Sequence, residues 1–278
     1  MELNLEGFDE YLRAILNEDI GTGDITTTSC VSETASCTGQ LIAKESGVIC
    51  GLNVVVLMFN LLDKSVIIVP KIDDGDLIHA GDVIATIYGN SRSILTGERT
   101  ALNLLQHLSG IATKTSECVN SIYGTKTQIK DTRKTTPGLR IFEKYAVRCG
   151  GGINHRFNLA DGVLIKDNHI KAAGGITNAV KMTRDNIPAD MKIEVEVESL
   201  DEVNEALEAG ADIIMFDNMP VDKMSEAVKI VNGRALTEAS GNMGDRDLME
   251  VAKTGVDFIS IGALTHSVKS LDISLKLD

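Results

Sequence analysis

The stretch IEVEVESLDEVNEALEAGADIIMFD, residues 193–217, decides the fold class of this chain. It opens with alternating apolar and acidic residues, a pattern typical of a strand. A helical segment follows, in which Ser199 and Glu202 have the spacing of a capping box and Gly210 marks the end. A second apolar run then ends on Asp217. This strand–helix–strand unit predicts parallel strands joined by a right-handed crossover.

The same alternation continues on both sides of this stretch. The apolar runs, each ending in polar residues, are QIKDTRK (128–134), GVLIKDNH (162–169), IEVEVES (193–199), DIIMFDN (212–218), ALTEASG (235–241) and DFISIGALTHS (257–267). The repeat predicts an α/β fold, either a βα barrel or a doubly wound sheet. Side chains suited to chemistry follow all six runs. A doubly wound sheet needs them only near its switch point, so we favour the barrel.

The first hundred residues have a different pattern. Residues 39–51 and 65–89 alternate apolar and polar residues between Gly and Asp turns, which predicts short antiparallel strands. The echo of GDLI (75–78) and GDVI (81–84) predicts two similar turns. A biotinyl- or lipoyl-like module is disfavoured, because no lysine occupies a hairpin tip. Leucines at helical spacing predict a helix over residues 96–123.

These patterns divide the chain into two domains. We predict an N-terminal α/β domain, residues 1–110, which the C-terminal tail, residues 267–278, rejoins. Residues 111–266 form the predicted barrel.

Composition limits the partners. The net charge is −13, aromatic residues make up 4% and Trp is absent, so we expect neither nucleic acid nor membrane as a partner. The longest apolar run, VVVLMFNLL, is too short to span a bilayer. The five cysteines are scattered without a C-x-x-C pair, and no signal-peptide pattern opens the chain. These features predict a cytoplasmic protein with free thiols.

One segment, residues 131–156, concentrates positive charge in this acidic chain. Arg133, Lys134, Arg156 and Lys166 follow or precede predicted strands, so the barrel would gather them at one mouth. Several guanidinium and ammonium groups together indicate a ligand with several negative charges. Three further cations are interpreted as solvated or in structural ion pairs with Glu143; they are Arg140, Lys144 and Arg148.

Carboxylates and glycines complete the candidate site. Glu194 and Glu196 alternate to one side of a strand, and Asp217 ends the next. They would bind Mg²⁺, sugar hydroxyls or the lysines, or form an internal ion pair. EASGNMG and ISIGALTHS place Ser or Gly after the last two strands, where barrels commonly hold phosphate. The candidate acid–base groups are His155, His169 and His266, whereas we expect His107 to pack in a helix.

Eight motifs occur in order along nearly the whole chain. They are EDIGTGDITT, GERTALNLLQHLSGIAT, DTRKTTPGLRIFEKYAVRCGGGINHR, LIKDNH, EVEV, GADIIMFDNM, EASG and ISIGALTHS. Together they resemble the quinolinate phosphoribosyltransferase family. The resemblance implies an open-sided βα barrel with an N-terminal α/β sandwich, and a homodimer in which the sandwich of one subunit covers the barrel mouth of the other.

The resemblance also implies an activity. Quinolinate and phosphoribosyl pyrophosphate would give nicotinate mononucleotide, pyrophosphate and CO₂, with Mg²⁺ as cofactor, in NAD biosynthesis. Lys166, Glu196 and Asp217 would be catalytic, and Glu196 and Asp217 would hold the metal. The substrate-binding set implied is Arg99 of the partner subunit, Arg133, Lys134, Thr135, His155, Arg156, Lys166, Glu196, Asp217, Ser240, Gly241, Asn242, Ser260, Gly262 and His266.

Two positions depart from the family pattern. Asn242 stands where a second glycine is expected, and Phe216 replaces a leucine before Asp217. A relative that uses nicotinate, the molybdenum-associated paralogue, and a non-catalytic sensor of a phosphorylated metabolite stay open as alternatives.

Overall fold

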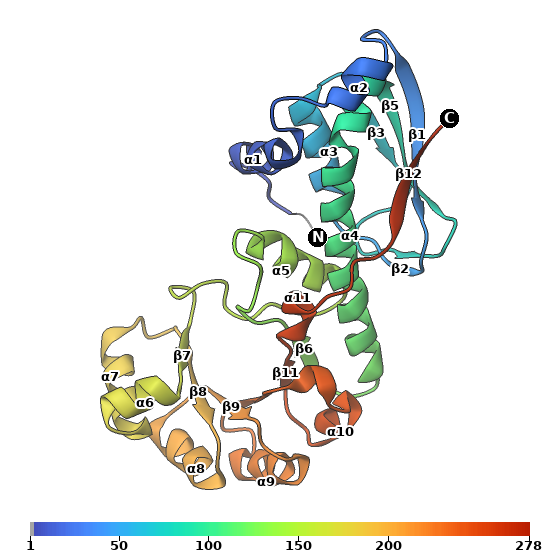
Figure 1. Ribbon diagram of the computed structural model, residues 1–278. Coiled ribbons are helices and arrows are strands. Elements are labelled where there is room, and N and C mark those ends of the chain that lie inside the picture. Colours follow the sequence, from blue (N-terminus) through green and yellow to red (C-terminus); the bar gives the residue numbers. More distant parts are fainter. Residues whose placement is uncertain (1–2) are drawn as a thin grey trace. The chain divides into compact units, whose positions relative to one another are not determined.

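The computed structural model describes residues 3–278, which form two compact units (Figure 1). The first unit comprises the described chain up to Ser116 together with Ile141–Gly151 and Val268–Asp278. The second comprises Glu117–Arg140 and Gly152–Ser267. The tail lies with the first unit, and so does the short segment 141–151, which the sequence analysis placed within the barrel segment.

The first unit is an antiparallel sheet with helices on one face (Figure 1). Its four-stranded sheet has the order β12-β1-β5-β3. The strands are β1 (Ser36–Ala43), β3 (Ile67–Pro70), β5 (Val83–Asn90) and β12 (Ile273–Leu277). The helices are α1 (Asp9–Ile20), α2 (Ile25–Cys30), α3 (Leu52–Leu62), α4 (Ser91–Ser121, whose last turn enters the second unit) and α5 (Arg140–Cys149).

The core of this unit lies between the sheet and the helices. Apolar side chains from β1, α3, β5, α4 and β12 line one small apolar space there, among them Leu41, Phe59, Ile87, Leu105 and Leu275. Their removal from water is the main favourable term in folding such a layer. The prediction of an N-terminal α/β sandwich is confirmed.

The two echoed turns have the same chemistry. Asp76 Oδ2 accepts a bond from the backbone N–H of Asp73 at 2.9 Å, and Asp82 Oδ2 accepts one from His79 at 2.8 Å. The glycine before each aspartate has a positive φ, 100° and 97°, which a side chain would oppose. The first turn leads into β4 (Leu77–Ile78), which pairs with β2 (Gly47–Val48). The predicted pair of turns is confirmed.

Two helices differ from expectation. Helix α4 begins at Ser91 rather than near residue 96, because the side chain of Asn90 accepts bonds from the N–H groups of Arg92 and Ser93 and caps it. In α5, Glu143 and Lys144 are buried, and His107 Nε2 of α4 lies 2.9 Å from Glu143 Oε1. Because Lys144 is buried, it is not a solvated cation, and of the two interpretations given above only the structural one remains. None of the helices within residues 3–278 has the length and apolarity needed to cross a membrane.

The second unit is a ring of six parallel strands with helices outside it (Figure 1). The strands are β6 (Gln128–Lys130), β7 (Val163–Ile165), β8 (Ile193–Val197), β9 (Ile213–Asp217), β10 (Leu236–Ser240) and β11 (Phe258–Ser260). The helices are α6 (Asp167–Ala173), α7 (Ile176–Asn186), α8 (Leu200–Ala209), α9 (Val221–Val231), α10 (Leu248–Lys253) and α11 (Ala263–His266), with a 3₁₀ turn, η1 (Met243–Asp245).

The strand order decides between the two predicted folds. The sheet runs β6-β11-β10-β9-β8-β7. From β7 to β11, neighbouring strands are consecutive in the chain, and the first strand, β6, pairs with the last, β11. β6 and β7 do not pair in the described structure. A doubly wound sheet would reverse its order at a switch point. The observed order is that of a barrel open on one side, as predicted.

Residues 193–217, which predicted the fold class, form the expected strand, helix and strand. Ser199 accepts a bond from the N–H of Glu202 at 3.2 Å, and α8 ends at Gly210 with φ 85°. The glutamate side chain reaches the N–H of Glu198 rather than that of Ser199, at 2.7 Å. The cap is thus shifted by one residue from a regular capping box.

Candidate active site

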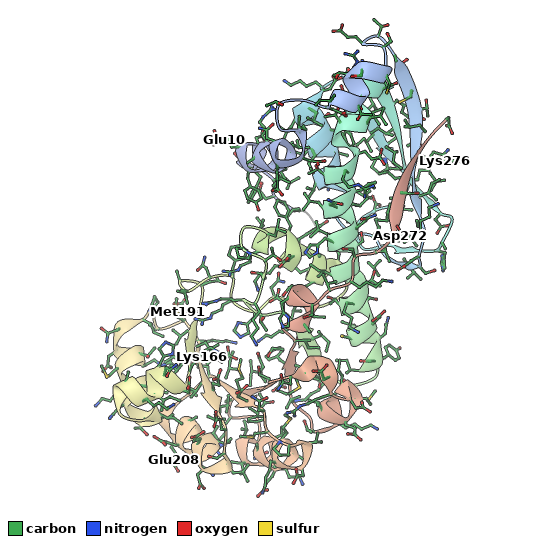
Figure 2. The ribbon with its side chains drawn as sticks, viewed as in Figure 1. Glu10, Lys166, Met191, Glu208, Asp272 and Lys276 are labelled. Atoms are coloured by element: carbon green, nitrogen blue, oxygen red, sulfur yellow. The ribbon has the colours of Figure 1, made fainter. Side chains whose placement is uncertain are left out.

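A cavity of about 610 Å³ lies at the carboxyl ends of the barrel strands. Its lining comes from Thr132, Arg133, Lys134, His155, Arg156, Leu164, Lys166, Glu196, Met215, Asp217, Asn218, Ser240, Gly241, Asn242, Met243, Gly244, Asp245, Ser260, Gly262, Ala263, His266 and Ser267. Because parallel strands end at one edge, residues spread over more than 130 positions of sequence converge there. Figure 2 shows Lys166 at the end of β7.

The structure brings nearly all the predicted site residues into this cavity. Two residues of the substrate-binding set that the resemblance implies, Thr135 and Arg99, do not line it. Thr135 accepts a bond from Arg140 Nε at 2.9 Å, so its hydroxyl supports the loop after β6. Arg99 lies on α4 in the first unit, and its predicted role toward a partner subunit stays a prediction.

Two guanidinium groups form one side of the cavity. Arg133 Nη1 is buried and has no hydrogen-bond partner within the described protein. Arg156 Nη1 donates to the carbonyl of Gly162 at 2.8 Å. Burial, and then the positive charge of Arg133, lower the pKa of Arg156, while Glu194 opposes this. A buried donor without a partner is costly, so this side is prepared to receive an anion.

His155 lies between a backbone N–H group and two buried carboxylates. Its Nδ1 accepts a bond from the N–H of Arg156 at 2.8 Å. Its Nε2 lies 3.0 Å from Glu194 Oε2 and 3.7 Å from Glu238 Oε1. Its role as an acid–base group stays a prediction. Its neighbour on the sequence, Asn154, is fixed by Asp131 Oδ2 at 2.6 Å.

Next to His155 lies a buried ion pair that was not predicted from the sequence. Lys130 Nζ lies 2.6 Å from Glu238 Oε2, and the two side chains are 9% and 0% exposed. Burial, followed by the negative charge of Glu194, raises the pKa of Glu238, and Lys130 and His155 oppose this. The signal in the sequence was a charged residue inside each apolar run, Lys130 in QIKD and Glu238 in ALTEAS.

Three of these buried groups also have the spacing of metal ligands. The ligand atoms of His155, Glu194 and Glu238 lie within 4.8 Å of one another. The Lys130 ammonium already supplies a positive charge to Glu238, and the imidazole lies beside Glu194. We therefore interpret the cluster as structural.

The two carboxylates predicted to be catalytic, Glu196 and Asp217, also line the cavity. Glu196 Oε2 is 2.9 Å from Lys166 Nζ, and Asp217 Oδ2 accepts a bond from Asn218 Nδ2 at 2.9 Å. Each carboxylate keeps a second oxygen for a ligand. Two hard oxygen donors facing a cavity fit the preference of Mg²⁺ for one or two carboxylates with water and phosphate oxygens. His169, by contrast, uses Nδ1 to accept from the N–H of Lys166 at 3.0 Å and caps α6.

The predicted phosphate seat has little room for side chains. A Cβ on Gly262 would lie 2.9 Å from Lys134 Cδ and 3.2 Å from the ring of His266. A side chain at this position would therefore displace Lys134 or the ring of His266. Thr265 fastens the same loop by donating to the carbonyl of Lys134 at 2.8 Å.

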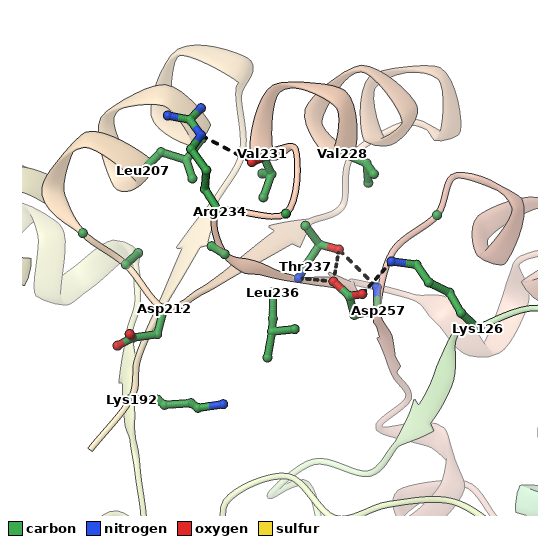
Figure 3. A pocket seen from close by; sticks show the side chains of 15 residues that line it. Lys126, Lys192, Leu207, Asp212, Val228, Val231, Arg234, Leu236, Thr237 and Asp257 are labelled. Atoms are coloured by element: carbon green, nitrogen blue, oxygen red, sulfur yellow. Dashed lines mark hydrogen bonds and ion pairs between the residues drawn. The ribbon is translucent and has the colours of Figure 1, made fainter. Parts of the chain in front are cut away.

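A second cavity, of about 510 Å³, lies at the amino ends of the strands (Figure 3). It contains none of the predicted site residues. Two of its charges pair within the protein: Lys126 Nζ is 2.7 Å from Asp257 Oδ1, and Asp257 Oδ2 accepts from the backbone and hydroxyl of Thr237. Although burial opposes it, Lys126 and then Thr237 hold the pKa of Asp257 low. We interpret this end as structural, as is usual for barrels.

Comparison with known proteins agrees with the geometry. The sequence matches the family described as quinolinate phosphoribosyl transferase, N-terminal domain, over residues 24–109, and its C-terminal domain over residues 111–276. A curated relative from Bacillus subtilis (strain 168), described as a probable carboxylating nicotinate-nucleotide pyrophosphorylase, is 49% identical over 268 residues, covering 95% of this chain and 92% of the relative.

Solved structures give the same result. The crystal structure of NadC from Streptococcus pyogenes is 44% identical, with a TM-score of 0.94, covering 100% of this chain and 99% of that one. The nicotinate-nucleotide pyrophosphorylase from Francisella tularensis is 44% identical, with a TM-score of 0.95, covering 100% and 98%. Both domains and the full length match, so this chain belongs to the quinolinate phosphoribosyltransferase family.

Proposed function

We propose that the cavity at the carboxyl ends of the strands is where this chain joins quinolinate to phosphoribosyl pyrophosphate. The products are nicotinate mononucleotide, pyrophosphate and CO₂. One observation carries this assignment: Arg133, Arg156 and Lys166 share a single cavity with Glu196 and Asp217. Although the protein has a net charge of −13, these three residues thus form a local cluster of positive charge that can bind two polyanionic substrates.

The guanidinium side suits the two carboxylates of quinolinate. Arg133 presents a buried Nη1 without a protein partner, and burial together with the charge of Arg133 disfavours the charge of Arg156 until an anion arrives. A carboxylate that accepts from both groups would relieve this. Charge-assisted bonds to arginine are among the strong ones and fix orientation as well.

The carboxylates suit the ribose. When pyrophosphate leaves, the anomeric carbon becomes cationic, and the negative charges of Glu196 and Asp217 stabilise it electrostatically. Their free oxygens also accept bonds from the ribose hydroxyls. Glu196 and Asp217 would hold Mg²⁺, which supplies charge neutralisation to the pyrophosphate oxygens when bound.

The remaining residues position the other groups. Lys134 meets phosphate oxygens as a point charge. The 5′-phosphate lies against Ser240, Gly241, Asn242, Ser260, Gly262 and His266. The pyridine nitrogen, held in line, then attacks the anomeric carbon, and its alkylation stabilises the carbanion left when the adjacent carboxylate departs as CO₂. Lys166 contacts that carboxylate region.

We further propose that the active form is a homodimer whose sites each receive Arg99 from the partner subunit. Arg99→Ala and Lys166→Ala would each be nearly inactive alone. If one site combines residues of two subunits, a mixed dimer holds one intact site, so random mixing should restore about a quarter of wild-type activity. Turnover after co-refolding an equal mixture measures this. Mixtures that stay as inactive as their components contradict a shared site.

We place the enzyme in the cytoplasm. All five cysteines, Cys30, Cys37, Cys50, Cys118 and Cys149, are free thiols. Free thiols persist in a reducing compartment, which supports this placement.

The direct test supplies quinolinate or nicotinate with phosphoribosyl pyrophosphate and Mg²⁺, and follows nucleotide and CO₂ together. We expect quinolinate to yield both products in equal amounts and nicotinate to yield little of either. The reason is that a monocarboxylate leaves one guanidinium of the pair without its anion. Turnover of nicotinate but not quinolinate would overturn the substrate assignment. Tight binding of phosphoribosyl pyrophosphate without any product would indicate a sensor.

A further inference from the structure

Three polar side chains lie in series across the ends of β9 and β10. Asn242 Nδ2 donates to Asn218 Oδ1 at 3.3 Å, and Asn218 Nδ2 donates to Asp217 Oδ2 at 2.9 Å. All three residues line the cavity at the carboxyl ends of the strands. We refer to this series as the asparagine relay.

The relay selects one orientation of the central amide. If the Asn218 amide turned over, its oxygen would face the Asp217 carboxylate and its NH₂ group would face the NH₂ group of Asn242. Both contacts would then be repulsive, because neither pair would contain a donor and an acceptor. The bond from Asn242 therefore favours the same amide orientation as the bond to Asp217.

The backbone is shaped to allow these contacts. Asn218 has φ 53° and Asn242 has φ 52°, both left-handed, a region that asparagine tolerates better than most residues. Between them Gly241, with φ 90°, leaves room: a Cβ there would lie 2.3 Å from Asn218 Oδ1 and 2.7 Å from its backbone nitrogen. The N–H of Asn218 donates to the carbonyl of Ser240 at 3.0 Å, which joins the two loops.

Asp217 needs such support. The terminal torsion of an aspartate is broad, so the carboxylate turns easily unless something holds it. Among residues 3–278, Asn218 is the side chain that bonds this carboxylate. With Oδ2 held, Oδ1 keeps a fixed direction into the cavity. A carboxylate oriented before the substrate arrives stabilises developing charge without reorganising.

We propose that Asn218 and Asn242 are positioning residues for phosphoribosyl transfer: Asn218 orients the Asp217 carboxylate, and Asn242 fixes the Asn218 amide. This inference rests on the role proposed above for Asp217. It also accounts for Asn242, which stands where the resemblance led us to expect glycine. Glycine would suit φ 52° at no cost, and the bond to Asn218 gives the side chain a use.

The test compares Asn218→Gly, Asn242→Gly and the double variant. Glycine keeps the left-handed backbone and removes only the side chain. We expect Asn218→Gly to lower kcat about 10- to 100-fold, because it removes the charge-assisted bond to Asp217. We expect Asn242→Gly to lower kcat about 2- to 10-fold, because it removes one neutral hydrogen bond. If Asn242 acts through Asn218, the double variant will be no slower than Asn218→Gly alone.

The chain offers a matched control in Asn232. It has φ 45° at the end of α9 and lines neither cavity. Asn232→Gly removes the same side chain from the same type of backbone and should leave kcat unchanged. Calorimetry gives a readout apart from turnover: phosphoribosyl pyrophosphate with Mg²⁺ should bind Asn218→Gly more weakly than wild type, while quinolinate binds both equally.

The outcomes separate the possible failures. A wild-type protein that does not convert quinolinate refutes the proposed function itself. An active wild type with an equally active Asn218→Gly variant refutes the relay alone. A double variant slower than Asn218→Gly shows that Asn242 does not act through Asn218. Should Asn218→Gly unfold, Asn218→Asp replaces it; this variant keeps the shape but loses the donor, and full activity in it would also refute the relay.

Discussion

Lys166→Ala is expected to lower turnover of quinolinate by about two to four orders of magnitude while the protein stays folded. The side chain is 47% exposed and lies 2.9 Å from Glu196, so its removal opens no buried cavity. What is lost is the ammonium that we propose to lie beside the carboxylate region of the substrate. Initial rates by CO₂ release, with thermal unfolding of the same preparation, measure both effects.

A matched control is available on the next helix. Lys171 of α6 pairs with Asp167 at 3.4 Å across an exposed face and does not line the cavity. Lys171→Ala should keep full activity. A Lys166→Ala variant that turns over quinolinate at the wild-type rate would remove Lys166 from the mechanism.

Lys130→Met is expected to destabilise the protein by about 3–5 kcal/mol, because it leaves the Glu238 carboxylate buried without its partner. The two atoms lie 2.6 Å apart, and the glutamate is fully buried. The pKa of Glu238 is already raised above the usual 4.5 by burial and Glu194. Without Lys130 it rises further, so the stability deficit of the variant should grow as pH rises through the raised pKa that Glu238 has in the wild type. Chemical denaturation at several pH values measures this.

Two further variants make that test specific. Lys126→Met breaks an ion pair of similar length, 2.7 Å, whose lysine is 63% exposed, and should cost less than about 1 kcal/mol. Lys130→Met combined with Glu238→Gln removes the buried charge as well and should recover much of the loss. Equal destabilisation by Lys126→Met and Lys130→Met would show that the buried pair contributes no more than a surface one.

The barrel could be predicted because each strand and helix in its alternating series is encoded by residues that are close together in the sequence. Residues 193–217 contain a strand, a capped helix and a second strand, each readable from its own neighbours. The same holds for the carboxyl-end residues, since a parallel strand ends in a fixed direction. Glu194 and Glu196 illustrate the limit. Alternation placed both on the inner face, but it did not tell the buried support, Glu194, from the cavity-lining Glu196.

Contacts between segments that lie far apart in the chain could not be predicted from the sequence. Nothing local in GLRIFEKYAVRCG shows that α5 packs in the first unit, where Tyr145 donates to Asp74 at 2.9 Å and Phe142 meets Phe8 with ring centres 5.4 Å apart. His155 could be singled out but not its state, because that depends on Glu194 and on the N–H of Arg156. Asn242 was marked as a departure, and only the approach of Asn218 gives it a partner.

The first unit's sheet has a consequence for the order of synthesis in the cell. Its edge strand β12, residues Ile273–Leu277, pairs antiparallel with β1 from Gly39↔Leu277 to Ala43↔Ile273. The ribosome makes β1 long before β12. Until β12 is made, the backbone groups along one side of β1 have no strand to pair with, and such an edge recruits other nascent chains. Chains truncated before Ile273 are therefore the ones most exposed to aggregation.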